Sequence, residues 1–288
     1  MALRLATCLA VLAACALLLA APAAAAAAGD PDVAALQVAL RAQGLYAGTI
    51  DGMPGPATER AVILLQRKAG LPPDGVVGPR TREALGPLGG PDLGSRPLHP
   101  GAMGWDVAEL QFLLAWHGFP SGPFDGVFGP RLEAALRRYQ RFAGLSPVGF
   151  AGPATTASLA GPLPRSPLHL GWPLQAPLGD GFGPREAAFH AGLDLKAPAG
   201  TAVAAAAAGR VVYAGPRGSF GNAVLVAHGR GVRTLYAHLS RVDVSLGERV
   251  AAGQAIGLVG ASGRANGPHL HFEVRVRGAA VDPLTALD

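Results

Sequence analysis

The sequence predicts a multidomain chain in which two small all-α modules, each of about three helices, precede an all-β domain of the sandwich or barrel-like class. A segment with helical apolar periodicity occurs twice in tandem, and short β-branched and aromatic runs separated by glycine follow it. With 41 glycines and 26 prolines among 288 residues, the composition suits several small, turn-rich domains better than one large core.

The first 28 residues are set apart from the fold because they indicate an export signal. Arg4 precedes a Leu/Ala run, and alanines at 26–28 offer a cleavage site. We favour a cleaved signal, which leaves no stable membrane insertion and places the protein in the periplasm, the cell wall or the extracellular space. Two alternatives stay open. The run is long enough for an uncleaved anchor, and residues 12–15 have the types of a lipoprotein box, although the apolar run continues past Cys15.

Cysteine content and charge exclude several classes of function. Cys8 and Cys15 both lie in the signal, so the mature chain has no disulfide and no thiol nucleophile, and any metal must be held by histidine and carboxylate. The net charge of +5 favours an anionic partner such as a cell wall or a membrane face. The arginines are scattered and no aromatic-basic module accompanies them, which argues against nucleic acid. We expect a monomer.

The tandem segments, residues 31–86 and 102–160, are a duplication. Gln37 matches Gln111 and Gln66 matches Gln140, and each pair is 74 positions apart (111 − 37, 140 − 66). The turns with the pattern D-G-x-x-G-P bring proline to the first helical position at Pro56 and, in the second copy, at residue 130.

Conspicuous polar and aromatic residues of the repeats have structural readings. We expect Asp51 and Asp125 to accept backbone N–H groups within their turns. Tyr46, Trp105 and Trp116 are expected to be buried anchors, although a saccharide groove is the alternative reading.

The repeats resemble the peptidoglycan-binding domain family of small helical modules. The resemblance is carried by the "L-Q...L...G" opening, the "D-G-x-x-G-P-x-T" turn and the "Q-R-x-x-G-L" close. It implies peptidoglycan as a partner. The Pro/Gly-rich segments 87–101 and 161–173 are expected to be linkers.

From residue 174 to 288 the pattern changes to strands. Five runs rich in β-branched and aromatic residues carry the prediction: "RVVYAG", "NAVLVAHG", "VRTLYAHL", "QAIGLVG" and "HLHFEVRV". Their close spacing indicates a sandwich or barrel-like domain.

The last of these runs carries two histidines one residue apart. Alternation along a strand puts His269 and His271 on one face, and we place Glu273 on the opposite face without a catalytic role. The motif "HAGLD" adds His190 four residues before Asp194, and "LYAHLS" adds His238 in a neighbouring strand. A His/His/Asp set that leaves one position open is the arrangement expected of catalytic zinc.

These motifs, with "GERVAAGQAIGLVGASGRANGPHLHFEV" and the closing "VDPL", resemble the lysostaphin/LytM-type zinc endopeptidases over about residues 168–288. That family hydrolyses peptide bonds in peptidoglycan. The resemblance implies one zinc ion per chain, held by His190, Asp194 and His271, and two catalytic histidines that do not bind the metal, His238 and His269.

Zinc in such a site lowers the pKa of water and polarises a carbonyl. A histidine that titrates near neutral pH can accept the proton from water. We assign that role to His269 and the stabilisation of the oxyanion to His238, and the two roles could be reversed.

The sequence therefore predicts an exported zinc metalloendopeptidase that cuts peptidoglycan cross-links or stem peptides and is anchored by its tandem modules. The alternative is a non-catalytic, wall-binding regulator of another cell-wall hydrolase. A purely wall-binding protein would leave the third domain unexplained. The cleaved bond stays open between Gly-Gly bridges and direct D-Ala to diamino-acid cross-links.

Overall fold

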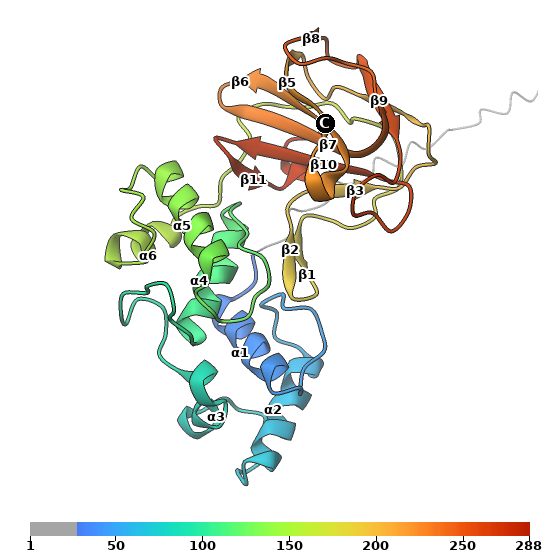
Figure 1. Cartoon of the computed structure of the whole chain (residues 1–288). Helices are drawn as coiled ribbons and strands as arrows, with labels where there is room; N and C mark the ends of the chain where they lie inside the picture. Colours follow the sequence, from blue (N-terminus) through green and yellow to red (C-terminus); the bar gives the residue numbers. More distant parts are fainter. Residues whose placement is uncertain (1–27) are drawn as a thin grey trace, which may run out of the picture.

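The computed structural model describes residues 28–288, so the predicted export signal lies outside the described residues except for Ala28. Helices occupy the N-terminal part of the described chain and strands the C-terminal part (Figure 1), which confirms the predicted fold class. Among the described residues, no helix has the length and apolar character needed to cross a membrane.

Six α-helices build the two modules of the described chain. All but one begin with a proline, whose missing N–H costs nothing at a first helical position. The first module contains α1 (Pro31–Ala42), α2 (Pro56–Lys68) and α3 (Pro79–Ala84), followed by the 3₁₀ turn η1 (Gly86–Gly89); the second contains α4 (Trp105–Trp116), α5 (Pro130–Phe142) and α6 (Pro153–Leu159).

The side chain of a buried glutamine forms hydrogen bonds with each D-G turn and holds its conformation. The Oε1 atom of Gln37 accepts the N–H groups of Asp51 and Gly52, both at 3.0 Å, while its Nε2 donates to Asp51 Oδ1 at 2.8 Å. The same carboxylate accepts the Met53 N–H at 2.9 Å, and Asp125 accepts an N–H in the same way in the second module. The prediction that these aspartates are turn residues is therefore confirmed.

This glutamine bridge also recurs within each module. Gln66 holds the turn at Asp74 and Gly75, with Nε2 donating to the carboxylate at 2.8 Å and Oε1 accepting at 2.9 Å. Gln111 repeats the arrangement in the second module. Gln140 keeps the bond from the Gly149 N–H, but its Nε2 donates to the Phe150 carbonyl, because Val148 stands where the first module has Asp74. Each module thus contains two turns held by a buried glutamine, a recurrence that the 74-residue period alone does not reveal.

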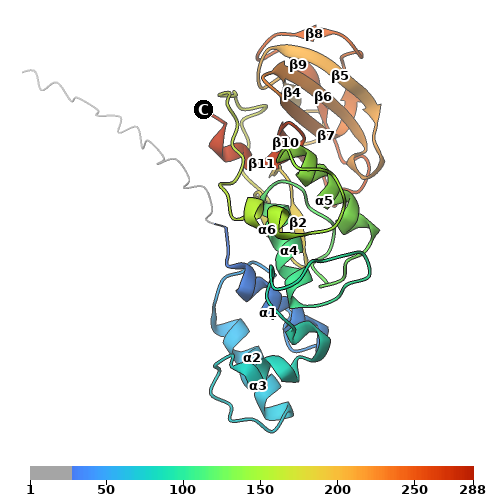
Figure 2. The same cartoon turned by 90° about the vertical axis from the view of Figure 1, so that its left-hand side faces the viewer.

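The two modules pack on each other through α1 and α4 (Figure 2). Trp105 Nε1 donates to Asp32 Oδ1 of the first module at 2.8 Å, and the Arg82 guanidinium lies 4.1 Å from the centre of the Trp105 ring. Tyr46, Trp105 and Trp116 are 8%, 3% and 6% exposed, so the prediction of buried anchors is confirmed.

The C-terminal domain is an antiparallel sheet of nine strands within the described residues. Its main path runs β11-β10-β7-β6-β5-β8, and β7 also pairs with β9 near its end, so that the sheet curls around an apolar core. The strands are β3 (Leu193–Leu195), β4 (Ala202–Ala204), β5 (Gly209–Pro216), β6 (Asn222–Gly229), β7 (Val232–Val242), β8 (Arg249–Val250), β9 (Ala255–Val259), β10 (Leu270–Val276) and β11 (Ala279–Val281), with 3₁₀ turns η2 (Gly218–Phe220) and η3 (Pro283–Thr285).

A separate hairpin leaves this sheet and extends toward the helices (Figure 1). It consists of β1 (Gly183–Arg185) and β2 (Ala188–His190), which pair only with each other among the described strands.

Glu109 on α4 gives the modules a testable pH dependence. Burial, together with the charges of Asp32 and Asp92, raises its pKa to about 8, despite a hydrogen bond from the Leu93 N–H. Between its ordinary pKa and about 8 the folded state therefore binds more protons than the unfolded state, so stability falls as pH rises. We expect Glu109→Gln to abolish this loss, raising the unfolding midpoint relative to wild type more at pH 8 than at pH 5. Equal pH dependence of the two proteins in urea unfolding would contradict the assignment.

Candidate metal centre

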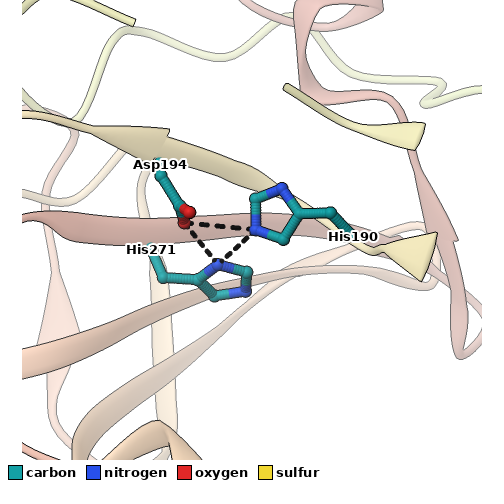
Figure 3. A group of neighbouring side chains, drawn as sticks. All are labelled: His190, Asp194 and His271. Carbon is teal, nitrogen blue, oxygen red and sulfur yellow. Dashed lines mark hydrogen bonds and ion pairs between the residues drawn. The ribbon is translucent and has the colours of Figure 1, made fainter. Parts of the chain in front are cut away.

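Three elements bring His190, Asp194 and His271 to one point (Figure 3). His190 ends β2, while Asp194 and His271 are direct partners across the antiparallel pair β3 and β10. Cross-strand partners project on the same face of a sheet. Gly192 permits this approach, because a Cβ atom there would lie 2.4 Å from the Phe272 carbonyl oxygen.

The three facing atoms form a nearly equilateral triangle. His190 Nε2 lies 3.1 Å from Asp194 Oδ1, His271 Nδ1 lies 2.9 Å from the same oxygen, and the two nitrogens are 3.0 Å apart. Tetrahedral zinc with bonds of about 2.0–2.1 Å needs ligand atoms about 3.3 Å apart. The triangle is therefore close to the size that a zinc ion requires.

Hydrogen bonds on the outer side of each imidazole fix the ring protons. His190 Nδ1 lies 2.8 Å from the Gly181 carbonyl oxygen, which can only accept, so Nδ1 carries the hydrogen. His271 Nε2 donates to Glu273 Oε1 at 3.1 Å. In the neutral rings, both inward nitrogens then present lone pairs to each other and to the Asp194 carboxylate. Three acceptors that face one another need a cation, and two nitrogens with one carboxylate oxygen suit zinc.

In the metal-free protein a proton can take the place of the cation. Burial by itself would lower the pKa of His271, but its hydrogen bonds to Asp194 and Glu273 outweigh burial and raise that pKa to about 9. Burial would raise the pKa of Asp194, and the hydrogen bonds from His190 and His271 hold it below its ordinary value instead. Metal binding at this site therefore displaces a proton.

The placement of Glu273 on the opposite face of the strand was wrong. Every second residue of a strand shares a face, so Glu273 lies on the side of His271 and is its hydrogen-bond partner. The Glu273 carboxylate is 1% exposed and also accepts from Arg275 Nε at 2.6 Å. A second residue without a role in the sequence analysis, Arg185, lies with Nη1 3.4 Å from Asp194 Oδ2, the oxygen that faces away from the triangle.

His238 and His269 lie on the same side of the site. Their ring centres are 4.7 Å apart, and that of His238 is 5.9 Å from His271. His238 Nδ1 donates to the Ser262 carbonyl at 2.8 Å, and His269 Nδ1 to the Gly267 carbonyl at 2.9 Å. Both rings thus leave Nε2 available. Of the two metal-binding histidines, His190 offers Nε2 to the triangle and His271 offers Nδ1.

His238 reaches this position through a strained backbone. Its φ of 62° lies in the left-handed region, where β7 shifts register against its neighbours. Such outliers cost about 1–3 kcal/mol and cluster at functional sites. All five residues selected from the sequence are therefore brought together, and the structure adds Glu273 and Arg185 around them.

Residues 188–283, which include the whole triangle, match the family model described as Peptidase family M23. The strand domain is a peptidase family M23 domain. M23 peptidases are zinc metallopeptidases. Residues 29–85 and 104–159 each match a second model, described as "Putative peptidoglycan binding domain".

Part of this chain is also similar to curated bacterial proteins. The DD-carboxypeptidase/endopeptidase Mpg of Neisseria meningitidis serogroup B is 48% identical over 97 residues, which are 34% of this chain and 22% of Mpg. The peptidoglycan DD-endopeptidase ShyA of Vibrio cholerae is 42% identical over 102 residues, 35% of this chain and 24% of ShyA. The chain thus spans less than a quarter of the length of these relatives.

Solved structures also match part of this chain. A zinc-containing peptidase from Vibrio cholerae is 33% identical, and the match covers 41% of this chain and 40% of that one with a TM-score of 0.40. The catalytic domain of lysostaphin from Staphylococcus simulans is 34% identical, with 38% and 90% covered and a TM-score of 0.36.

The outer hydrogen bond of His271 gives a test of the metal centre. We expect Glu273→Gln to weaken zinc binding about 10–100-fold, because it removes the negative charge that fixes the imidazole and raises its basicity. Competition with a chromophoric chelator measures the affinity. Glu83→Gln, the same change at an exposed position of α3, serves as the control. Equal affinity in the two variants would show that the buried carboxylate does not support the ligand.

Proposed function

We propose that this chain is an exported zinc metalloendopeptidase that hydrolyses peptide bonds in peptidoglycan and is anchored to the wall by its tandem modules. The observation that carries the proposal is the triangle of inward-facing acceptor atoms on His190, Asp194 and His271, with two further histidines on the same side. In the proposed enzyme these three residues hold one zinc ion. Zinc bound there supplies an acidified water and an electrophile for the scissile carbonyl.

The electrostatic surroundings of His238 favour it as the proton acceptor, which reverses the first assignment from the sequence. Burial and the neighbouring imidazoles of His269 and His271 lower the pKa of His238, so its Nε2 keeps a lone pair at neutral pH. His269 Nε2 lies 3.7 Å from Asp194 Oδ1, and because Nδ1 donates to the Gly267 carbonyl, Nε2 donates a hydrogen bond only in the imidazolium form. We assign His269 the donation of a hydrogen bond to the oxyanion as it develops.

The names of the relatives narrow the choice of the peptide bond that the proposed enzyme cleaves. ShyA carries the description of a peptidoglycan DD-endopeptidase, and Mpg that of a DD-carboxypeptidase/endopeptidase. We therefore favour a bond between two D-configured residues, such as a D-Ala to diamino-acid cross-link, over a Gly-Gly bridge. The matched peptidoglycan-binding modules support the same polymer as the partner. Tethering to it raises the effective substrate concentration without a new contact in the active site.

Digestion of purified peptidoglycan tests the proposal. Residues 29–288 and the His271→Ala variant are incubated with the polymer, with zinc and then with a chelator, and fragments are identified by mass spectrometry. We expect new amino termini within the peptides, lost with the chelator and in the variant, because both remove the metal. Binding to several types of wall without new termini would contradict the proposal and support a non-catalytic regulator.

The two outer histidines give a separate test. We expect His238→Ala and His269→Ala to retain zinc while kcat falls about 10²–10⁴-fold, the range for positioned acid–base groups. Zinc content is measured beside the kinetics. A variant that loses zinc would have to be reassigned as a metal ligand, and one that keeps full kcat has no catalytic role.

A further inference from the structure

The β1–β2 hairpin delivers a large part of the metal centre. It ends in His190, it carries Arg185 beside Asp194, and the carbonyl that fixes the His190 ring belongs to Gly181, just ahead of the hairpin. The hairpin nevertheless stands apart from the large sheet. A two-stranded hairpin is marginally stable on its own in water, so other parts of the chain must hold it in place.

Equivalent positions of the two modules bind its turn. The Ile50 N–H of the first module donates to the Glu186 carbonyl at 2.8 Å, and the Phe124 N–H of the second donates to the Ala187 carbonyl at 2.6 Å. The two donors are 74 positions apart (124 − 50), the period of the duplication. Each precedes the aspartate of a glutamine-bridged turn, so both amides are held by rigid, related scaffolds.

The turn itself depends on these contacts. Glu186 adopts a φ of 54°, in the left-handed region that disfavours residues other than glycine. Such a conformation persists where the surroundings over-determine it. The carbonyls of the two central residues of the turn are both bound by the modules, which supplies that constraint.

An aromatic cluster fastens the strands of the hairpin to the second module. Trp116 of α4 makes edge contacts with Phe182 and Phe189, at ring-centre distances of 6.2 and 5.3 Å, and those two rings lie 5.0 Å apart. Phe189 directly precedes His190. The position of the metal ligand is therefore linked to α4 through one neighbouring side chain.

The same end of α4 also contacts the sheet. The Ala280 N–H of β11 donates to the Gly118 carbonyl at 3.0 Å. A Cβ atom at Gly118 would lie 2.2 Å from the Ala280 carbonyl oxygen, so this close approach requires glycine. Since β11 pairs with the C-terminal part of β10, the second module touches both the hairpin that carries His190 and a neighbour of the strand that carries His271.

We propose that the tandem modules are a clamp that positions the β1–β2 hairpin, so that zinc affinity of the M23 domain depends on the modules. Trp116 is a positioning residue in this clamp. The inference rests on the proposed zinc site and adds that the duplication is part of the metal centre's support as well as a wall anchor.

Zinc affinity of the full mature chain tests the clamp. We expect Trp116→Ala to weaken zinc binding about 10–100-fold, as loss of outer support does at other metal sites. The matched control is Leu65→Ala, a buried residue of α2, which lies at the end of the modules away from the sheet (Figure 1). Both variants lose core packing, but only the first touches the hairpin. Weakened binding in Trp116→Ala alone supports the clamp, and equal affinities in the two variants overturn it.

Hydrogen exchange of the wild type gives a readout that needs no variant. Coupling is reciprocal, so zinc bound at His190 must stabilise the contacts that the modules make with the hairpin. We expect the amides of Ile50 and Phe124 to exchange several-fold more slowly with zinc, while those of α2 do not change. Unchanged exchange at both amides, with zinc bound, overturns the clamp. A wild type that binds no zinc overturns the proposed function and the clamp together.

Discussion

The proposed chemistry depends on hydrogen bonds that hold each histidine of the site by its outer nitrogen. Three of the four acceptors are backbone carbonyls, those of Gly181, Ser262 and Gly267, and the fourth is the Glu273 carboxylate. A carbonyl has the position that the chain path gives it. The backbone positions of the hairpin, of β7 and of the segment before β10 therefore set the direction of each inward lone pair. A shift in any of these segments would misplace a ligand or catalytic nitrogen of the metal centre.

Much of the fold could be predicted because its long elements carry a clear period. The five strand runs have enough alternating residues to be predicted as strands. The helices are predicted from the spacing of their apolar residues and from the prolines that come after the D-G turns. The hairpin and β3, β4, β8 and β11 have only two or three residues each, too few to show a period. The docking of the hairpin on the modules is a long-range contact, to which no local pattern points.

For the site, the sequence predicted which residues meet but not how each one is held. The H-x-H motif and its spacing bring the rings to one face, whereas the left-handed backbone of His238 leaves no trace in residue types. Glu273 was predictable, since simple alternation places it beside His271, and the error lay in applying that rule. Its pairing with Arg275 shows why a buried carboxylate is tolerated there, because each charged group has a partner.

The contact of the single hairpin turn with two equivalent amides also determines how many ligands this face of the duplicated modules can bind. A duplicated module would ordinarily present two copies of the same binding surface, each able to bind its own ligand. Here a single turn, that of the β1–β2 hairpin, binds the equivalent positions Ile50 and Phe124 of both copies simultaneously. The copies have diverged accordingly, with Trp116 facing the hairpin where the first module has Ala42. At this face the two modules together form one asymmetric binding surface, which the β1–β2 hairpin of the same chain already occupies.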